Sequence, residues 1–161
     1  HQFQSLHEAL KLCKTKYSVK TRSDEYWINI DYMLQKFSKD KNKLVTSNVF
    51  YKPYYEQNYH ISDHLMIAKT ETLLLAMEII SQEPKEEVMR IVSESTFGWA
   101  FLQALSAGIP DNYEAFEKYF DYVNINNFDG YLVRWNSPPR GPKLVWSKPD
   151  GHLYLGENGV V

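Results

Sequence analysis

The hydrophobic residues of the first 123 positions recur mostly at the three- and four-residue steps of amphipathic helices. Ser5, with Glu8 three residues later, matches the reciprocal capping box that opens a helix. Leu6, Leu10 and Cys13 follow at helical spacing. A first helix is therefore expected here, with Cys13 pointing inward.

Two further helices are expected along the next part of the chain. The steps over 26–37 predict a second helix with Ser23 as its N-cap, after a connector at 18–22. Ser62 is positioned to cap a long helix that reaches about Gln82. Because that stretch is hydrophobic nearly all round, it is typical of a central helix.

Proline and glycine mark the remaining boundaries of the helical part. Pro84 suits the first turn of another helix, which continues or restarts over 97–105 and stops before Gly108. A last helix is expected over 111–123, where aromatic residues recur at steps of three and four. The stretch 44–52 is rich in β-branched and aromatic residues and could be a strand, an irregular arm or a short helix, and the ambiguity extends to His60. A loop is expected over 44–60.

The hydrophobic period changes to strict alternation in the last forty residues. Alternating runs at 131–135, 144–147 and 152–155 predict strands, and the Lys-Pro-Asp-Gly sequence at 148–151 is typical of a hairpin turn. Together these runs predict a three-stranded antiparallel meander.

The patterns combine into one expected architecture. A length of 161 residues fits a single domain. We expect an α+β fold over 1–161, with a mainly helical body of about five helices at 1–123 and a small β-sheet at 131–156.

Cysteine content and hydropathy favour a soluble, cytoplasmic protein. Cys13 is the only cysteine, so no disulfide can form within the chain. The longest apolar run, 73–77, is far shorter than the roughly 20 residues that span a bilayer, and 1–11 shows no signal peptide. No membrane association and no cofactor are expected.

The charge is unevenly distributed along the chain. Residues 1–52 carry a net charge of +5, residues 53–130 carry −9, and residues 131–161 carry +2. An acidic middle between basic ends favours a partner of defined charge, although solvated helix faces also produce such a pattern.

The sharpest chemical candidate is the sequence His60-Ile-Ser-Asp-His64. On a helix, two imidazoles four residues apart share one face, as a zinc site requires. Over these five residues the chain resembles the His-x-x-Glu-His signature of the inverted zincin metalloproteases, with Asp63 in the place of the family's glutamate. The alternative is that Asp63 and His64 lie in an exposed first turn of a helix.

The leading functional hypothesis is a non-enzymatic protein-binding module with an acidic, tyrosine-bearing surface that docks on a basic partner. Bacterial immunity proteins, which neutralise toxin nucleases, are similar in size, acidity and lack of motifs. The residues expected to form this surface are Glu86, Glu87, Glu94, Asp111, Tyr113, Glu114, Glu117, Asp121 and Tyr122.

Two alternatives come from other functional classes. One is a metal-dependent hydrolase that uses His60, Asp63 and His64, which elemental analysis would distinguish from a binding protein. The other is a nucleic-acid accessory protein that uses the basic first third of the chain. Nucleic-acid binding is not favoured, because the lysines are spread out and no recognition signature accompanies them.

Overall fold

Helices and strands are interspersed along the chain in the computed structural model, which describes residues 2–23, 25–48, 57–83, 93–105, 113–124, 127–128, 130–137, 141–147 and 153–156. The described helices are α1 (Gln2–Leu12), α2 (Asp31–Lys39), α3 (Thr70–Gln82), α5 (Ser93–Leu105) and α6 (Tyr113–Tyr119). The described strands are β1 (Tyr17–Thr21), β2 (Glu25–Ile28), β3 (Leu44–Ser47), β4 (Leu65–Lys69), β5 (Phe120–Val123), β6 (Gly130–Ser137), β7 (Gly141–Ser147) and β8 (Leu153–Gly156).

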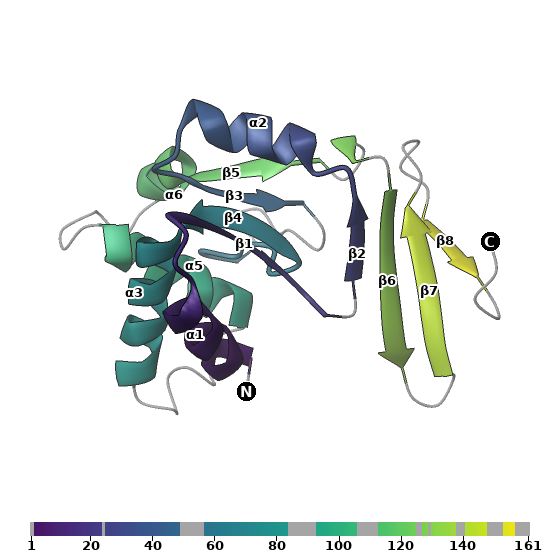
Figure 1. Cartoon of the computed structure of the whole chain (residues 1–161), viewed down its shortest axis with the longest axis horizontal. Helices are drawn as coiled ribbons and strands as arrows, with labels where there is room; N and C mark the ends of the chain where they lie inside the picture. Colours follow the sequence, from purple (N-terminus) through teal and green to yellow (C-terminus); the bar gives the residue numbers. More distant parts are fainter. Residues whose placement is uncertain are drawn as a thin grey trace.

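The strands form two four-stranded sheets (Figure 1). Sheet A has the order β1-β4-β3-β5, in which β3 and β5 run parallel and the other pairs run antiparallel. Sheet B has the order β2-β6-β7-β8 and is antiparallel throughout. The chain crosses from sheet A to sheet B between β1 and β2, so the two sheets are joined near the N-terminus.

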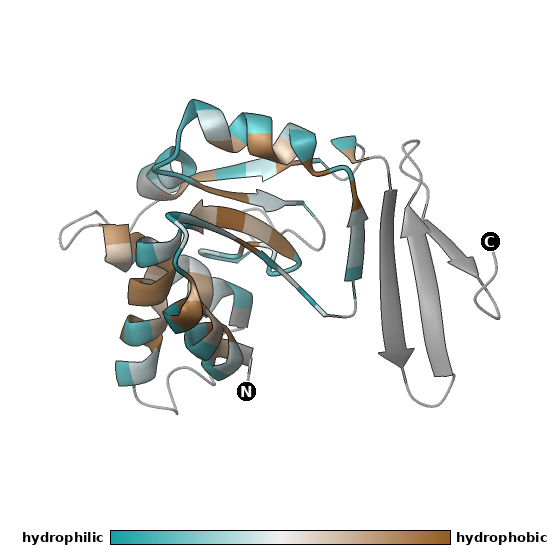
Figure 2. Cartoon of the chain, in the orientation of Figure 1, coloured by the Kyte–Doolittle hydropathy of each residue, from teal (hydrophilic) through white to brown (hydrophobic). Residues whose placement is uncertain are grey.

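Sheet A separates two hydrophobic cores. Alternate side chains of β4 point to opposite faces: Met66 and Ala68 pack with residues of α1, α3, α5 and α6, whereas Leu65 and Ile67 pack with residues of α2. Figure 2 shows the hydrophobic stretches along β4 and α3. The described part is therefore a three-layer arrangement of helices, sheet A and α2, with sheet B beside it (Figure 1).

The expected mixture of helices and strands is confirmed, but the expected helical body at 1–123 is wrong because sheet A lies within it. The three C-terminal strands pair antiparallel in chain order, yet their sheet has β2 as a fourth strand. A separate three-stranded meander is therefore not confirmed. No described helix is both long enough and apolar enough to cross a bilayer.

The expected helix over 26–37 is wrong in its first half. Strand β2 occupies 25–28, with Tyr26 and Ile28 exposed and Trp27 partly buried, which is the alternation of a strand. Asn29 then adopts a positive φ of 57°, and its side-chain oxygen accepts a hydrogen bond from the backbone N–H of Asp31 at 3.1 Å. Helix α2 begins only at that point.

The expected helix from Ser62 to Gln82 is also wrong in its first third. Residues 65–69 form β4, and Ser62 is buried before it. Because β4 is covered on both faces, its residues 65–68 are all hydrophobic, and periodicity does not distinguish them from a buried helical turn. The helix itself, α3, starts at Thr70.

Smaller corrections concern element ends. The last expected helix stops at Tyr119, where β5 begins, and 44–47 form β3 rather than a loop. Cys13 follows the end of α1 and is exposed, not inward-facing. Residues 49–56, 84–92 and 106–112 lie outside the described residues, and so does the start of the helix expected at Pro84. Its expected continuation or restart over 97–105 is confirmed, because α5 covers those residues.

Candidate functional site

The proposed metal-ligating segment, His60 to His64, does not lie on a helix. It is a loop that leads into β4, and His60, Asp63 and His64 are all buried. The expectation that the two imidazoles share one helical face is therefore wrong. The alternative of an exposed first turn is wrong as well, since tertiary contacts cover this loop.

His64 lies between two carboxylates. Its Nδ1 contacts the carboxylate of Glu25, and its Nε2 lies 3.8 Å from Oδ1 of Asp63. The Glu25 side chain is fully buried, and it reaches His64 from β2. Both ring nitrogens of His64 therefore face carboxylates of this chain.

Two cations complete an ionic cluster, defined here as Lys20, Arg22, Glu25, Asp63 and His64. The Lys20 ammonium donates to the backbone carbonyl of Asp63 and lies 3.4 Å from Oδ2 of the same residue. Arg22 Nε lies 3.2 Å from Oε1 of Glu25. Burial lowers the pKa of Lys20, while the carboxylates of Asp63 and Glu25 partly oppose that shift.

The ionic cluster joins the two sheets. Lys20 belongs to β1 of sheet A, and Glu25 belongs to β2 of sheet B. The indole N–H of Trp27 donates to Oε2 of Glu25 at 3.1 Å, and the Trp27 ring meets Phe128 edge-on with centroids 4.9 Å apart. The ionic cluster therefore holds β2 of sheet B against sheet A.

The described part of the chain contains no set of side chains that could bind a metal ion. No group of three or more histidine, cysteine, aspartate or glutamate side chains there is placed to hold one. Glu25 and Asp63 are instead neutralised by Lys20 and Arg22, whose charges would repel a bound cation. The structure does not bring His60 and His64 together as a metal site.

Three of the six described members of the expected acidic surface, Tyr113, Glu114 and Glu117, lie on α6. Tyr113 is 50% exposed, and its hydroxyl contacts the carboxylate of Glu117. Glu114 is also exposed, while Glu94 lies in the first turn of α5. The other expected members, Glu86, Glu87 and Asp111, lie outside the described residues.

Asp121 and Tyr122 do not join that surface. Asp121 lies on β5, where its Oδ1 is 2.6 Å from the ammonium of Lys36 on α2. Tyr122 packs against the core beneath α5 and α6. The N-terminal lysines therefore neutralise one of the expected acidic residues, and the fold uses the other for packing.

A hollow of about 650 Å³ lies beside α6. It is named here the α3–α5–α6 hollow, and its lining residues are Asp40, Asn42, Lys69, Glu71, Thr72, Leu75, Ala104, Leu105, Lys118 and Tyr119. Leu75, Leu105 and Tyr119 supply hydrophobic surface, and the charged residues are of both signs. Sequence analysis missed it because its residues come from distant segments; the one available signal was Leu75 on a nearly all-hydrophobic helix.

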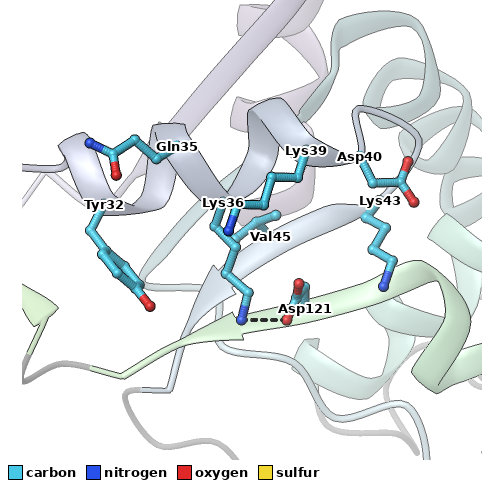
Figure 3. A pocket seen from close by; sticks show the side chains of 8 residues that line it. All are labelled: Tyr32, Gln35, Lys36, Lys39, Asp40, Lys43, Val45 and Asp121. Atoms are coloured by element: carbon cyan, nitrogen blue, oxygen red, sulfur yellow. Dashed lines mark ion pairs between the residues drawn. The ribbon is translucent and has the colours of Figure 1, made fainter.

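A second open site lies between α2 and the edge of sheet A (Figure 3). This α2–β5 cleft has a volume of about 400 Å³ and is lined by Tyr32, Gln35, Lys36, Lys39, Asp40, Lys43, Val45 and Asp121. Figure 3 shows the lysine side chains and Tyr32 extending from α2 and the start of β3 toward β5.

Comparison with known proteins gave no relative, since no protein-family model, curated protein or solved structure matches this chain.

Proposed function

We propose that this protein is a non-enzymatic protein-binding module that recognises its partner at the α3–α5–α6 hollow and the adjoining acidic face of α6. The observation that carries this proposal is an open hollow with hydrophobic residues in its lining and charged residues of both signs around them. Protein interfaces combine a desolvated hydrophobic centre with a polar rim in this way.

The hydrophobic lining is suited to an anchor residue of the partner. Leu75 is 43% exposed although α3 is otherwise largely buried, and Leu105 and Tyr119 are partly buried beside it. An aromatic or aliphatic side chain of a partner, placed against these three residues, would remove part of their exposed surface from water. Interfaces draw most of their binding energy from a few anchors of this kind.

The charges of the lining balance, with Asp40 and Glu71 against Lys69 and Lys118, so the preference for a basic partner rests on the carboxylates that α6 presents outside the lining. Glu71, Glu114 and Glu117 are exposed, and they bring negative charge to α3 and α6. Two lysines of the hollow have contacts of their own: the Lys69 ammonium donates to Asn42 at 2.8 Å, and the Lys118 ammonium lies 5.1 Å above the Tyr119 ring. Complementary charge of this kind accelerates association and selects among partners.

The placement of the ionisable groups in the ionic cluster supports binding rather than catalysis. His64, Glu25 and Asp63 are buried, and they pair with one another or with Lys20 and Arg22. A general base needs a ring nitrogen or carboxylate that reaches a substrate. These groups are directed toward each other and stabilise the junction of the two sheets.

The narrower form of the proposal is an immunity-type inhibitor of a basic toxin nuclease in the cytoplasm. Acidic side chains on α6 would then cover the surface with which the nuclease binds nucleic acid. The exposed, unpaired thiol of Cys13 suits a reducing compartment. This form predicts that the purified chain inhibits the nuclease and that inhibition weakens as salt rises.

The test compares two exposed leucines. Leu75→Asp places a charge in the hollow and should weaken partner capture at least about tenfold, because a desolvated anchor contributes roughly 1.4 kcal/mol or more. Leu12→Asp is the matched control, since Leu12 is 80% exposed at the end of α1 and should bind like the wild type. Capture of the partner from the native extract, followed by titration of the purified pair, gives both affinities.

A second arm of the same experiment tests the charge. The double variant Glu114→Lys and Glu117→Lys should slow association and abolish its salt dependence, whereas Glu8→Lys on α1 should not. Equal losses for the Leu75 and Leu12 variants, with both folded by circular dichroism, would remove the hollow from the interface. A partner captured equally by all variants would show that binding occurs elsewhere.

A further inference from the structure

Strand β5 is an edge strand of sheet A, and its backbone groups alternate between the sheet and the outside. Among the strands that the structure describes, it pairs only with β3, in parallel register. The carbonyl of Val123 accepts a hydrogen bond from the N–H of Asn48, so Val123 faces β3. Because successive residues of a strand direct their backbone groups to opposite sides, the N–H and C=O of Tyr122 face the outer edge.

Both of these outward backbone groups of Tyr122 are capped by side chains of this chain. The Tyr122 N–H donates to Oδ1 of Asp121 at 2.9 Å, and the Tyr122 carbonyl accepts from the Lys36 ammonium at 2.5 Å. The two capping groups also form an ion pair with each other, at 2.6 Å. A lysine–aspartate pair thus occupies the positions that a neighbouring strand would use.

The cleft above this edge has a small excess of positive charge, with Lys36, Lys39 and Lys43 against Asp40 and Asp121. Lys36 is neutralised by Asp121, but neither Lys39 nor Lys43 forms an ion pair with any residue that the structure describes. Tyr32, which is 47% exposed, adds a hydroxyl at the other end of the cleft. The cleft therefore offers hydrogen-bond donors and positive charge along an edge strand.

We propose that the α2–β5 cleft binds an extended acidic segment of a partner protein as an added strand on β5. Carboxylates of that segment pair with Lys39 and Lys43, and one of them replaces Asp121 beside Lys36. This exchange frees the N–H and C=O of Tyr122 for backbone hydrogen bonds to the segment. Strand addition supplies affinity through the main chain, and the charged side chains supply selectivity.

The lysine–aspartate cap then has a second role as a selectivity filter. In the absence of an acidic segment it leaves no free backbone pair at Tyr122, which protects the edge from unspecific strand pairing. A neutral or basic segment gains nothing by displacing Asp121 from Lys36. Only a segment that brings its own carboxylate compensates the lysine.

This inference goes beyond the proposed function and uses another surface. The α3–α5–α6 hollow lies on the face of sheet A that packs against α3 and α5, whereas the cleft lies on the face covered by α2. The linings of the two sites share Asp40, but each substitution tested lies in one site alone, so the two proposals can fail separately.

The experiment measures fluorescence anisotropy of a labelled short peptide of alternating glutamate and valine, added to the full chain. The double variant Lys39→Glu and Lys43→Glu should lower its affinity at least about tenfold. Lys11→Glu with Lys14→Glu, an equal charge change around the end of α1, is the matched control and should change it less than about twofold. Asp121→Asn keeps an oxygen for the Tyr122 N–H but removes the competing charge, so it should raise the affinity a few-fold.

A second peptide separates strand pairing from attraction of charge alone. The same sequence with N-methylated backbone has equal charge but cannot donate main-chain hydrogen bonds, and it should bind at least about fivefold more weakly. Equal binding of both peptides would overturn the proposal in favour of an unspecific anion site. So would the failure of the acidic peptide to bind, or equal losses in the cleft variant and its control. Inorganic phosphate as an equally effective competitor would assign the cleft to small anions.

Discussion

At the scale of single residues, the main feature is that charges are buried in mutual contact. Lys20 and Asp63 show why such groups must be considered in pairs. Removing one partner leaves the other charge buried without compensation, which destabilises a protein more than the pair itself stabilises it. The ionic cluster is therefore expected to be sensitive to single substitutions and tolerant of paired ones.

Lys20→Met should lower the free energy of unfolding by about 3 kcal/mol, because Asp63 keeps its charge in a buried position without the ammonium. Lys20→Met combined with Asp63→Asn should recover part of that loss. Urea unfolding of the two single variants and the double variant gives the coupling energy. A sum of single effects that equals the double effect would show that the pair is not coupled.

The same lysine predicts a dependence on pH. Burial lowers its pKa in the folded chain, so between the folded and unfolded pKa values the unfolded chain binds more protons. Stability from this group therefore rises with pH in that window, and the advantage of the wild type over Lys20→Met should grow as the pH rises toward about 10.4, the pKa of lysine in the unfolded chain.

At the scale of elements, close packing of a helix on a loop depends on one glycine. A Cβ at Gly98 of α5 would lie 2.0 Å from the backbone oxygen of Tyr59 and 3.4 Å from Cγ2 of Ile61. Tyr59 itself has a positive φ of 60°. The loop that leads into the ionic cluster therefore passes directly over α5, at a place where no side chain fits.

Gly98→Ala should destabilise the protein by about 2 kcal/mol or more, although alanine is the better helix former by roughly 1 kcal/mol. The loss comes from the displacement of the backbone at Tyr59, which cannot move aside like a flexible side chain. Gln103→Ala, on the same helix and partly exposed, is the control. Thermal unfolding of both variants provides the comparison, and a stabilised Gly98 variant would contradict the close approach.

At the scale of the whole molecule, the two sheets are joined by a few contacts around β2. Glu25 accepts a hydrogen bond from the Trp27 indole, forms an ion pair with Arg22 and contacts Nδ1 of His64. The Trp27 ring packs on Phe128. These contacts lie beside the connection from β1 to β2, where the chain first passes from sheet A to sheet B. Within the part of the chain whose side chains the structure describes, the contacts that position sheet B are those of the buried Glu25 carboxylate and the Trp27–Phe128 ring pair.

Glu25→Ala should loosen sheet B while sheet A stays folded, because His64 and Arg22 lose their shared partner. Hydrogen exchange followed by mass spectrometry should show faster exchange in β2, β6 and β7, with little change in α3 and β4. Glu8→Ala, which removes only an exposed pair with Lys11, serves as the control. Uniformly faster exchange in both sheets would mean that the molecule unfolds as one unit.

Several features were determined by the sequence alone, because they depend on residues close together in the chain. The steps of Met33 and Phe37 place them on the buried side of α2, and the alternating C-terminal runs became strands. An α-helix forms its hydrogen bonds four residues apart, and a hairpin closes across a short turn. Local patterns are sufficient to predict such elements.

Tertiary structure decided the elements and sites that depend on distant residues. Strands β1 and β3 form because they pair with distant strands: Tyr17 pairs with Lys69, and Leu44 pairs with Phe120. The hydrophobic pattern of four or five residues is too short to predict such partners. The ionic cluster likewise required Glu25 to reach His64 across 39 positions. Hydrogen bonds between strands and ion pairs across the fold are set by the path of the whole chain, which a short stretch of sequence does not contain.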